Sequence, residues 1–254
     1  MLNEINPIVQ NWRKLLAFRS VSQRNAVLPV FATSAAMVIN GLYSDGLRGD
    51  LDAKTVALWK LEGFGVAMGR DARPVAYCTP KEAWPILHVG FGGGLVARYG
   101  FVPYRLMDQI VSLSHPEFVQ YCWEGVGHML GLQNAPLMRR MVGMPRVICP
   151  DEKAFLESFA PAERNRIALG LGRLIYFSSW SLVSAIRKIE ARGYLDVGWA
   201  VYGAAFAYTM VNHRDFDSVK RTRPVYYSYD VQCAFADGVE GAFLFWKSTF
   251  PEKE

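Results

Sequence analysis

The chain has 254 residues, of which 51% are hydrophobic, so it is long and apolar enough to bury a full core, and this excludes a disordered chain. A net charge of +5 would suit a nucleic-acid-binding protein, but the 28 basic and 23 acidic residues are mixed along the sequence, which argues against one. The four cysteines are far apart in apolar surroundings, which is typical of reduced, buried thiols: Cys78, Cys122, Cys149 and Cys233.

The first 50 residues are predicted to form N-terminal helices. They lack a basic start followed directly by an apolar core, so we expect no signal peptide and a cytoplasmic protein. The uncharged stretch 25–44 could be long enough to cross a bilayer. Because it also contains proline, glycine and several polar residues, a buried helix is favoured over membrane association.

Helix starts are easily recognised after this region, because proline favours the first helical position and a polar cap favours the residue before it. Thr79-Pro80 with Glu82 has the pattern of a capping box. Further starts are predicted at His115-Pro116, Pro150-Asp151 and Ala160-Pro161. Apolar residues between the starts recur mostly at helical spacing, and strand-like alternation is scarce. The sequence therefore predicts an all-α fold in a single domain, 1–254.

Pairs of small residues recur inside the apolar helical segments between residues 51 and 245. They occur in Glu62–Gly65, His88–Gly92, Glu124–Gly127, Leu169–Gly172, Tyr202–Ala205 and Asp237–Gly241. Their starts are about 27 to 45 residues apart, close to the length of a two-helix unit. We therefore expect repeated helical hairpins that form an α-solenoid or an α/α toroid-like array.

Two explanations compete for these glycines. Each glycine inside a helix costs roughly 1 kcal/mol relative to alanine, so a compensating benefit is needed. Either the missing side chains let neighbouring helices approach closely, or they clear space for a ligand against the backbone. We expect close packing to be the main cause, and the two explanations are compatible.

Ionisable residues accompany the glycines, in apolar segments where such side chains are seldom found unpaired. The position just before the first glycine holds Glu62, Glu124, Tyr202 and Asp237. The residues within one helical turn of that position include His88, His128 and Arg173. Glu124 and His128 are four residues apart on one helix face, which suits a hydrogen-bonded acid and base or two metal ligands.

Two interpretations of these polar residues remain open. Each is a hydrogen-bonded core group, or the set converges on one site. In a convergent site, the residues for proton transfer are Glu62, His88, Glu124 and His128. Those for substrate binding are Arg173, Tyr202, Asp237 and two tryptophans near the motifs, Trp59 and Trp123. The spacing matches no established zinc or di-iron pattern, so we expect no metal and no cofactor.

The order of the motifs resembles a bacterial family of unknown function, encoded in enediyne polyketide and related natural-product biosynthetic clusters. The corresponding stretches are Gly41–Tyr43, Glu62–Met68, His88–Arg98, Glu124–His128, Gly170–Phe177 and Gly203–Tyr208. The chain resembles a divergent, shorter member, with Leu169 where a polar residue is expected. The resemblance implies a role near a hydrophobic, polyene-like intermediate and specifies no reaction.

These observations lead to two hypotheses on function. In the first, the protein is a natural-product biosynthetic enzyme that cyclises or isomerises a hydrophobic intermediate by acid/base chemistry. The intermediate is free or bound to a carrier protein, and Arg173 binds its carboxylate, phosphopantetheine or enolate oxygen. In the second, a non-catalytic helical-repeat protein binds a lipid-like ligand or a partner protein, and the polar residues link its helices. A homodimer is compatible with either, because exposed grooves of repeat arrays recruit partners.

Overall fold

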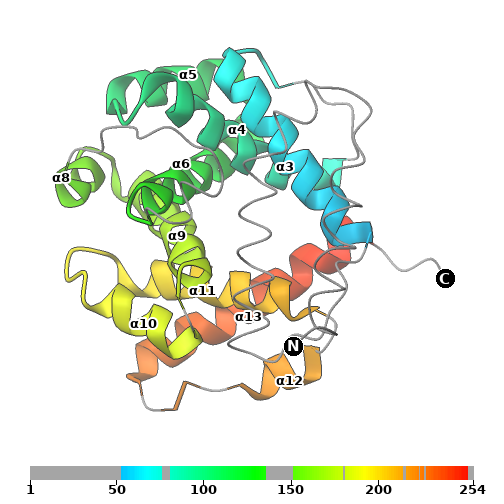
Figure 1. Cartoon of the computed structure of the whole chain (residues 1–254), viewed down its shortest axis with the longest axis vertical. Coiled ribbons are helices and arrows are strands. Elements are labelled where there is room, and N and C mark those ends of the chain that lie inside the picture. Colours follow the sequence, from blue (N-terminus) through cyan, green and yellow to red (C-terminus); the bar gives the residue numbers. More distant parts are fainter. Residues whose placement is uncertain are drawn as a thin grey trace, which may run out of the picture.

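The computed structural model describes residues 53–75, 81–135, 151–179, 181–213, 216–222, 224–225 and 227–250. All regular structure in these ranges is helical and none is β-strand, which confirms the all-α prediction (Figure 1). The predicted N-terminal helices, with the stretch 25–44, and the capping residues Thr79-Pro80 lie outside the described ranges. Within them, we find no helix that is both long and apolar enough to span a membrane.

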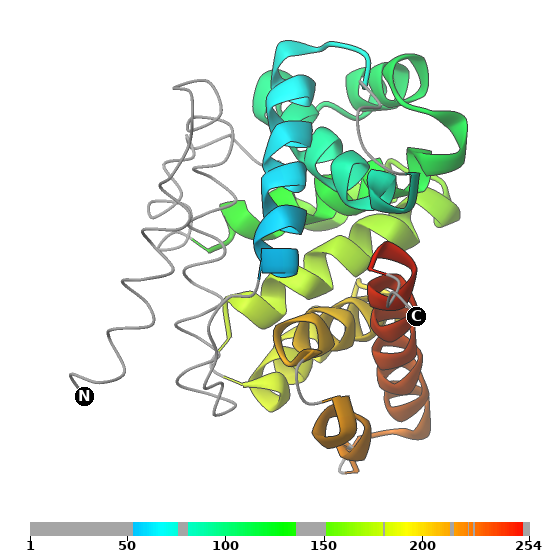
Figure 2. The same ribbon diagram turned by 90° about the vertical axis from the view of Figure 1, so that its right-hand side faces the viewer.

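Six long helices of the described chain follow one another as a series, and each packs mainly against its neighbours in that series (Figures 1 and 2). They are α3 (Ala53–Asp71), α4 (Trp84–Tyr99), α6 (Val119–Gln133), α9 (Pro161–Phe177), α11 (Val197–Val211) and α13 (Tyr229–Thr249). Shorter helices lie between them in the chain: α5 (Pro103–Leu113), α8 (Glu152–Glu157), α10 (Leu182–Glu190) and α12 (Phe216–Arg221). Two 3-10 turns precede α4 and α6, at Lys81–Ala83 and Pro116–Phe118.

Three of the predicted helix starts are confirmed. α8 follows Asp151, whose carboxylate accepts hydrogen bonds from two backbone N–H groups of the first turn. α9 begins at Pro161. The turn Pro116–Phe118 follows His115, whose Nδ1 accepts from the backbone N–H of Glu117 at 3.3 Å. These caps satisfy donors that a helix N-terminus otherwise leaves without a partner.

The recurring glycines lie where successive helices cross. In α6, a Cβ on Gly125 would stand less than 3.0 Å from the backbone of Val89 in α4. A Cβ on Gly127 would stand equally close to the backbone of Ile167 in α9. The same close approach occurs at Gly65, Gly90, Gly92, Gly170, Gly172, Gly203 and Gly238. Close packing is therefore the main reason for the repeat, as predicted.

The last helix of the series returns to the first two. Phe245 of α13 packs against a buried cluster that contains Leu58 of α3 and Ile86 of α4. At the end of α13, the hydroxyl of Thr249 donates to the backbone carbonyl of Glu82 at 3.4 Å. All six long helices thus contribute to one central region.

Candidate functional site

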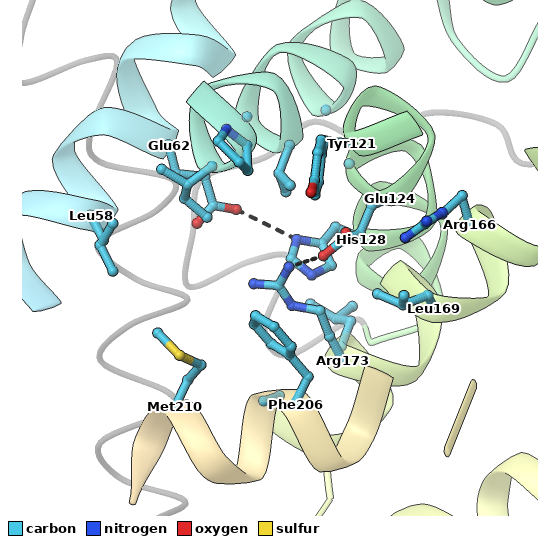
Figure 3. A pocket seen from close by; sticks show the side chains of 18 of the residues that line it. Leu58, Glu62, Tyr121, Glu124, His128, Arg166, Leu169, Arg173, Phe206 and Met210 are labelled. Carbon is cyan, nitrogen blue, oxygen red and sulfur yellow. Dashed lines mark hydrogen bonds and ion pairs between the residues drawn. The ribbon is translucent and has the colours of Figure 1, made fainter. Parts of the chain in front are cut away.

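The six long helices line a pocket of about 220 Å³. Figure 3 shows it from close by, with labelled side chains from α3, α6, α9 and α11. Most of its wall is apolar, and the polar side chains that line it are Glu62, Tyr121, Glu124, His128, Arg166, Arg173 and Tyr202. A concave, largely apolar space with a few convergent polar groups is typical of a small-molecule site.

Two positions of the repeat supply much of this wall. The position just before the first glycine supplies Glu62, Val89, Glu124, Leu169 and Tyr202. The third residue after that glycine supplies Val66, Gly93, His128, Arg173, Phe206 and Gly241. These two positions are four residues apart and share a helix face. Because the helices cross in the same register at each glycine motif, this face points into the pocket from each of them.

Glu62 and His128 meet across the pocket from α3 and α6 (Figure 3). The distance between Glu62 Oε1 and His128 Nδ1 is 3.5 Å, and each side chain is only 16% exposed. When the ring is neutral, this contact places its hydrogen on Nδ1, which can donate to the carboxylate. The other ring nitrogen, Nε2, is buried and has no hydrogen-bond partner within the described residues. In that tautomer, Nε2 carries a lone pair that faces no protein donor in the described residues.

Glu124 and Arg173 form a second pair, between α6 and α9 (Figure 3). The Nη1 of Arg173 donates to Glu124 Oε1, and both side chains are at least nine-tenths buried. The guanidinium also lies over the Phe206 ring, 5.0 Å from its centroid, while its buried Nε lacks a hydrogen-bond partner in the described part of the chain. Glu124 and His128, suggested by their spacing as a mutual pair, thus each contact a residue from another helix.

Two further polar residues of the pocket, Tyr121 and Arg166, escaped the sequence prediction. Each lies three residues before a pocket-facing position, so the register of the repeat could have indicated both. Burial raises the pKa of Tyr121 and of Tyr202; nearby Glu124 raises both further and Arg166 opposes the shift. Both phenols therefore keep their protons at neutral pH and can donate hydrogen bonds.

His88, predicted as a catalytic residue, lies outside this pocket. Its ring is fully buried and stacks on Phe118, with the centroids 5.2 Å apart. Nδ1 contacts the carbonyl of Trp84 at 2.8 Å, and Nε2 accepts from the backbone N–H of His115 at 3.3 Å. Both nitrogens are satisfied by backbone groups, so the structure places His88 in the core as a structural residue.

The burial of His88 predicts a loss of stability in mild acid. Burial lowers the pKa of its imidazole from 6.5 to about 4, although the Trp84 carbonyl acts in the opposite direction. The His88 imidazole is therefore protonated below about pH 6.5 in the unfolded chain, but only below about pH 4 in the folded chain. We expect the free energy of unfolding to fall by about 2 kcal/mol between pH 7 and pH 5 from this residue alone. Urea unfolding of wild type and His88→Gln at both pH values measures it, and equal pH dependence in the two proteins would contradict it.

Of the residues predicted to bind substrate, some line the pocket and others lie outside it. Tyr202 lines the pocket with Arg173. Asp237 is exposed and outside the pocket wall, although it is near enough to raise the pKa of Tyr202. Trp123 is buried in the core against Phe159, with ring centroids 5.2 Å apart. The side chain of Trp59 is not among those described.

Metal ligands do not cluster in the described ranges, where no three His, Cys, Asp or Glu side chains are placed to hold an ion.

The chain matches no protein-family model, and comparison with curated proteins and with solved structures also gives no match.

Proposed function

We propose that the protein is an acid/base enzyme, a cyclase or isomerase, that acts on a small and largely apolar molecule in this pocket. The observation that carries the proposal is the contact between Glu62 and His128, which leaves the buried Nε2 without a partner in the described chain. A carboxylate that fixes the tautomer and orientation of a histidine is a recurrent arrangement in general-base catalysis. Glu62 is then the positioning residue and His128 the base.

The same residues suit proton abstraction next to a carbonyl group. His128 Nε2 takes a proton from the carbon beside the carbonyl, and the electrons of the C–H bond move onto the carbonyl oxygen. Arg173 stabilises this developing oxyanion, because a fixed cation in a water-poor site favours negative charge. Return of the proton to another carbon completes an isomerisation. Alternatively, the enolate carbon attacks a second carbonyl, and the new alkoxide takes the proton from His128 to complete a cyclisation.

The remaining wall supports an apolar substrate. It includes Leu58, Ile86, Leu132, Phe177 and Met210. The resemblance to the family from enediyne clusters supports a polyketide or polyene-like intermediate, free or on a carrier protein, in a cytoplasmic pathway.

We also propose that the helical repeat has a toroid-like form, because α13 packs back onto α3 and α4.

Substitution of the proposed base tests the reaction. In a producing host that lacks the native gene, we expect His128→Gln to lower product formation by about 10²- to 10⁴-fold, the usual contribution of general-base catalysis. Glu62→Gln should lower it less, because the imidazole remains. Mass spectrometry of culture extracts measures the product, and thermal melting verifies that the variants are folded. Asp237→Asn is the matched control, since Asp237 is exposed and outside the pocket. Unchanged product from folded His128→Gln would refute the proposal.

A binding protein without catalysis is the second candidate, and the Glu124–Arg173 pair favours it. This pair joins α6 to α9 and could serve only to link the helices. If the polar residues are links alone, His128→Gln should lower the melting temperature and leave the amount of product unchanged. The same two measurements therefore separate the candidates.

A further inference from the structure

Gly93 differs from the other glycines in the helix interiors. Those glycines lie where a Cβ would come within 3.0 Å of a neighbouring helix or side chain. The nearest neighbour of a Cβ on Gly93 would be Cγ of Met129 at 3.4 Å, an ordinary van der Waals distance. Of the glycines beyond the first helical turn whose surroundings are described, only Gly93 has no such close neighbour. Close packing therefore does not explain it.

The position of Gly93 suggests another reason for the missing side chain. Gly93 lies in the pocket wall on α4, at the repeat position that carries His128 on α6 and Arg173 on α9. Side chains at this repeat position face the pocket, so a side chain on residue 93 would fill part of the pocket volume. Glycine also weakens a helix relative to alanine. The benefit that offsets this weakness is room in the pocket that the proposed base also lines.

The polar side of the pocket indicates what its ligand carries. Both carboxylates, Glu62 and Glu124, are engaged with a histidine or an arginine. Two guanidinium groups and two protonated phenols also line the wall and can donate hydrogen bonds to a ligand. The buried Nε of Arg173 is one such donor without a partner in the described chain, and an oxygen acceptor such as a carboxylate suits it.

We infer that Gly93 determines substrate specificity, and that the substrate is a slender, apolar monocarboxylate. Its apolar body lies against the bare backbone of α4 at Gly93, and its carboxylate binds at Arg173. This inference rests on the proposed function, because it concerns the same pocket. It adds the chemical class of the substrate and the residue that limits its width.

Calorimetric titration of the purified full chain with hexanoate, octanoate and decanoate tests the inference. We expect wild type to bind at least one of these carboxylates, and Gly93→Leu to bind it about tenfold more weakly or worse, because the new side chain fills the pocket. Gly93→Ala should melt at the same temperature as wild type or about 2 to 4 °C higher. Gly92→Ala is the matched contrast and should melt lower, because its Cβ would meet the backbone of Cys122.

Several results would overturn the inference. They are unchanged affinity in Gly93→Leu, a lowered melting temperature in Gly93→Ala, and no binding of any carboxylate by wild type. The proposed reaction is tested separately, since carboxylate binding needs no proton transfer. Loss of product in His128→Gln with normal binding in Gly93→Leu would overturn the inference alone. Weak binding in Gly93→Leu with full product in His128→Gln would overturn the reaction alone.

Discussion

Gly170→Ala is expected to lower the free energy of unfolding by about 2 to 3 kcal/mol, although alanine favours a helix. The added Cβ would stand less than 3.0 Å from the backbone of Glu124, where α9 crosses α6. Backbone atoms cannot rotate aside as a side chain can, so the two helices must separate. Thermal melting should show a decrease of about 5 to 10 °C.

Gly193→Ala is the control for this substitution. Gly193 has no atom within 4 Å of where its Cβ would be, so alanine should change the free energy of unfolding by less than about 0.5 kcal/mol. Equal melting temperatures for Gly170→Ala and Gly193→Ala would mean that the helix crossings tolerate a side chain. The packing explanation of the glycine repeat would then fail.

Arg173→Met is expected to have a still larger effect, a loss of about 3 to 5 kcal/mol in the free energy of unfolding. Methionine keeps the length of the side chain but removes the cation that pairs with Glu124. Glu124 is only 5% exposed, so its carboxylate would be left buried and without its partner. Chemical unfolding at pH 7 measures the loss.

The double variant Glu124→Met with Arg173→Met separates the ion pair from the packing around it. Two apolar side chains of similar size often replace a buried ion pair at little cost, so the double variant should recover most of the stability lost in Arg173→Met. A double variant that is less stable than either single variant would show that the pair contributes net stability. Full stability of Arg173→Met would show that water reaches Glu124.

The repeat register shows how far the sequence could locate the site. Glu62, Glu124 and Tyr202 hold equivalent positions in their motifs, and all three line the pocket as the register suggested. Asp237 holds the same position but is exposed. α13 is the last helix of the described series, and within the described residues the glycines of its motif lie against α11, so no following helix in the series covers Asp237.

His88 shows why distance along the chain is a poor guide to a site. It lies one residue before Val89, which faces the pocket. One residue turns the side chain by about 100° around the helix axis, since an α-helix has 3.6 residues per turn. The imidazole therefore points into the core beside Phe118, where backbone groups satisfy both nitrogens.

Local chemistry in the sequence alone determined the helical class, several helix starts and the places where helices cross. Proline geometry, polar caps and pairs of small residues act within one or two helical turns, so they can be read without knowing the fold. Only the tertiary structure decided that Glu62 meets His128, that Glu124 meets Arg173, and that Gly93 faces a pocket. These relations depend on the crossing and rotation of helices that are far apart in the chain, and no local pattern encodes them.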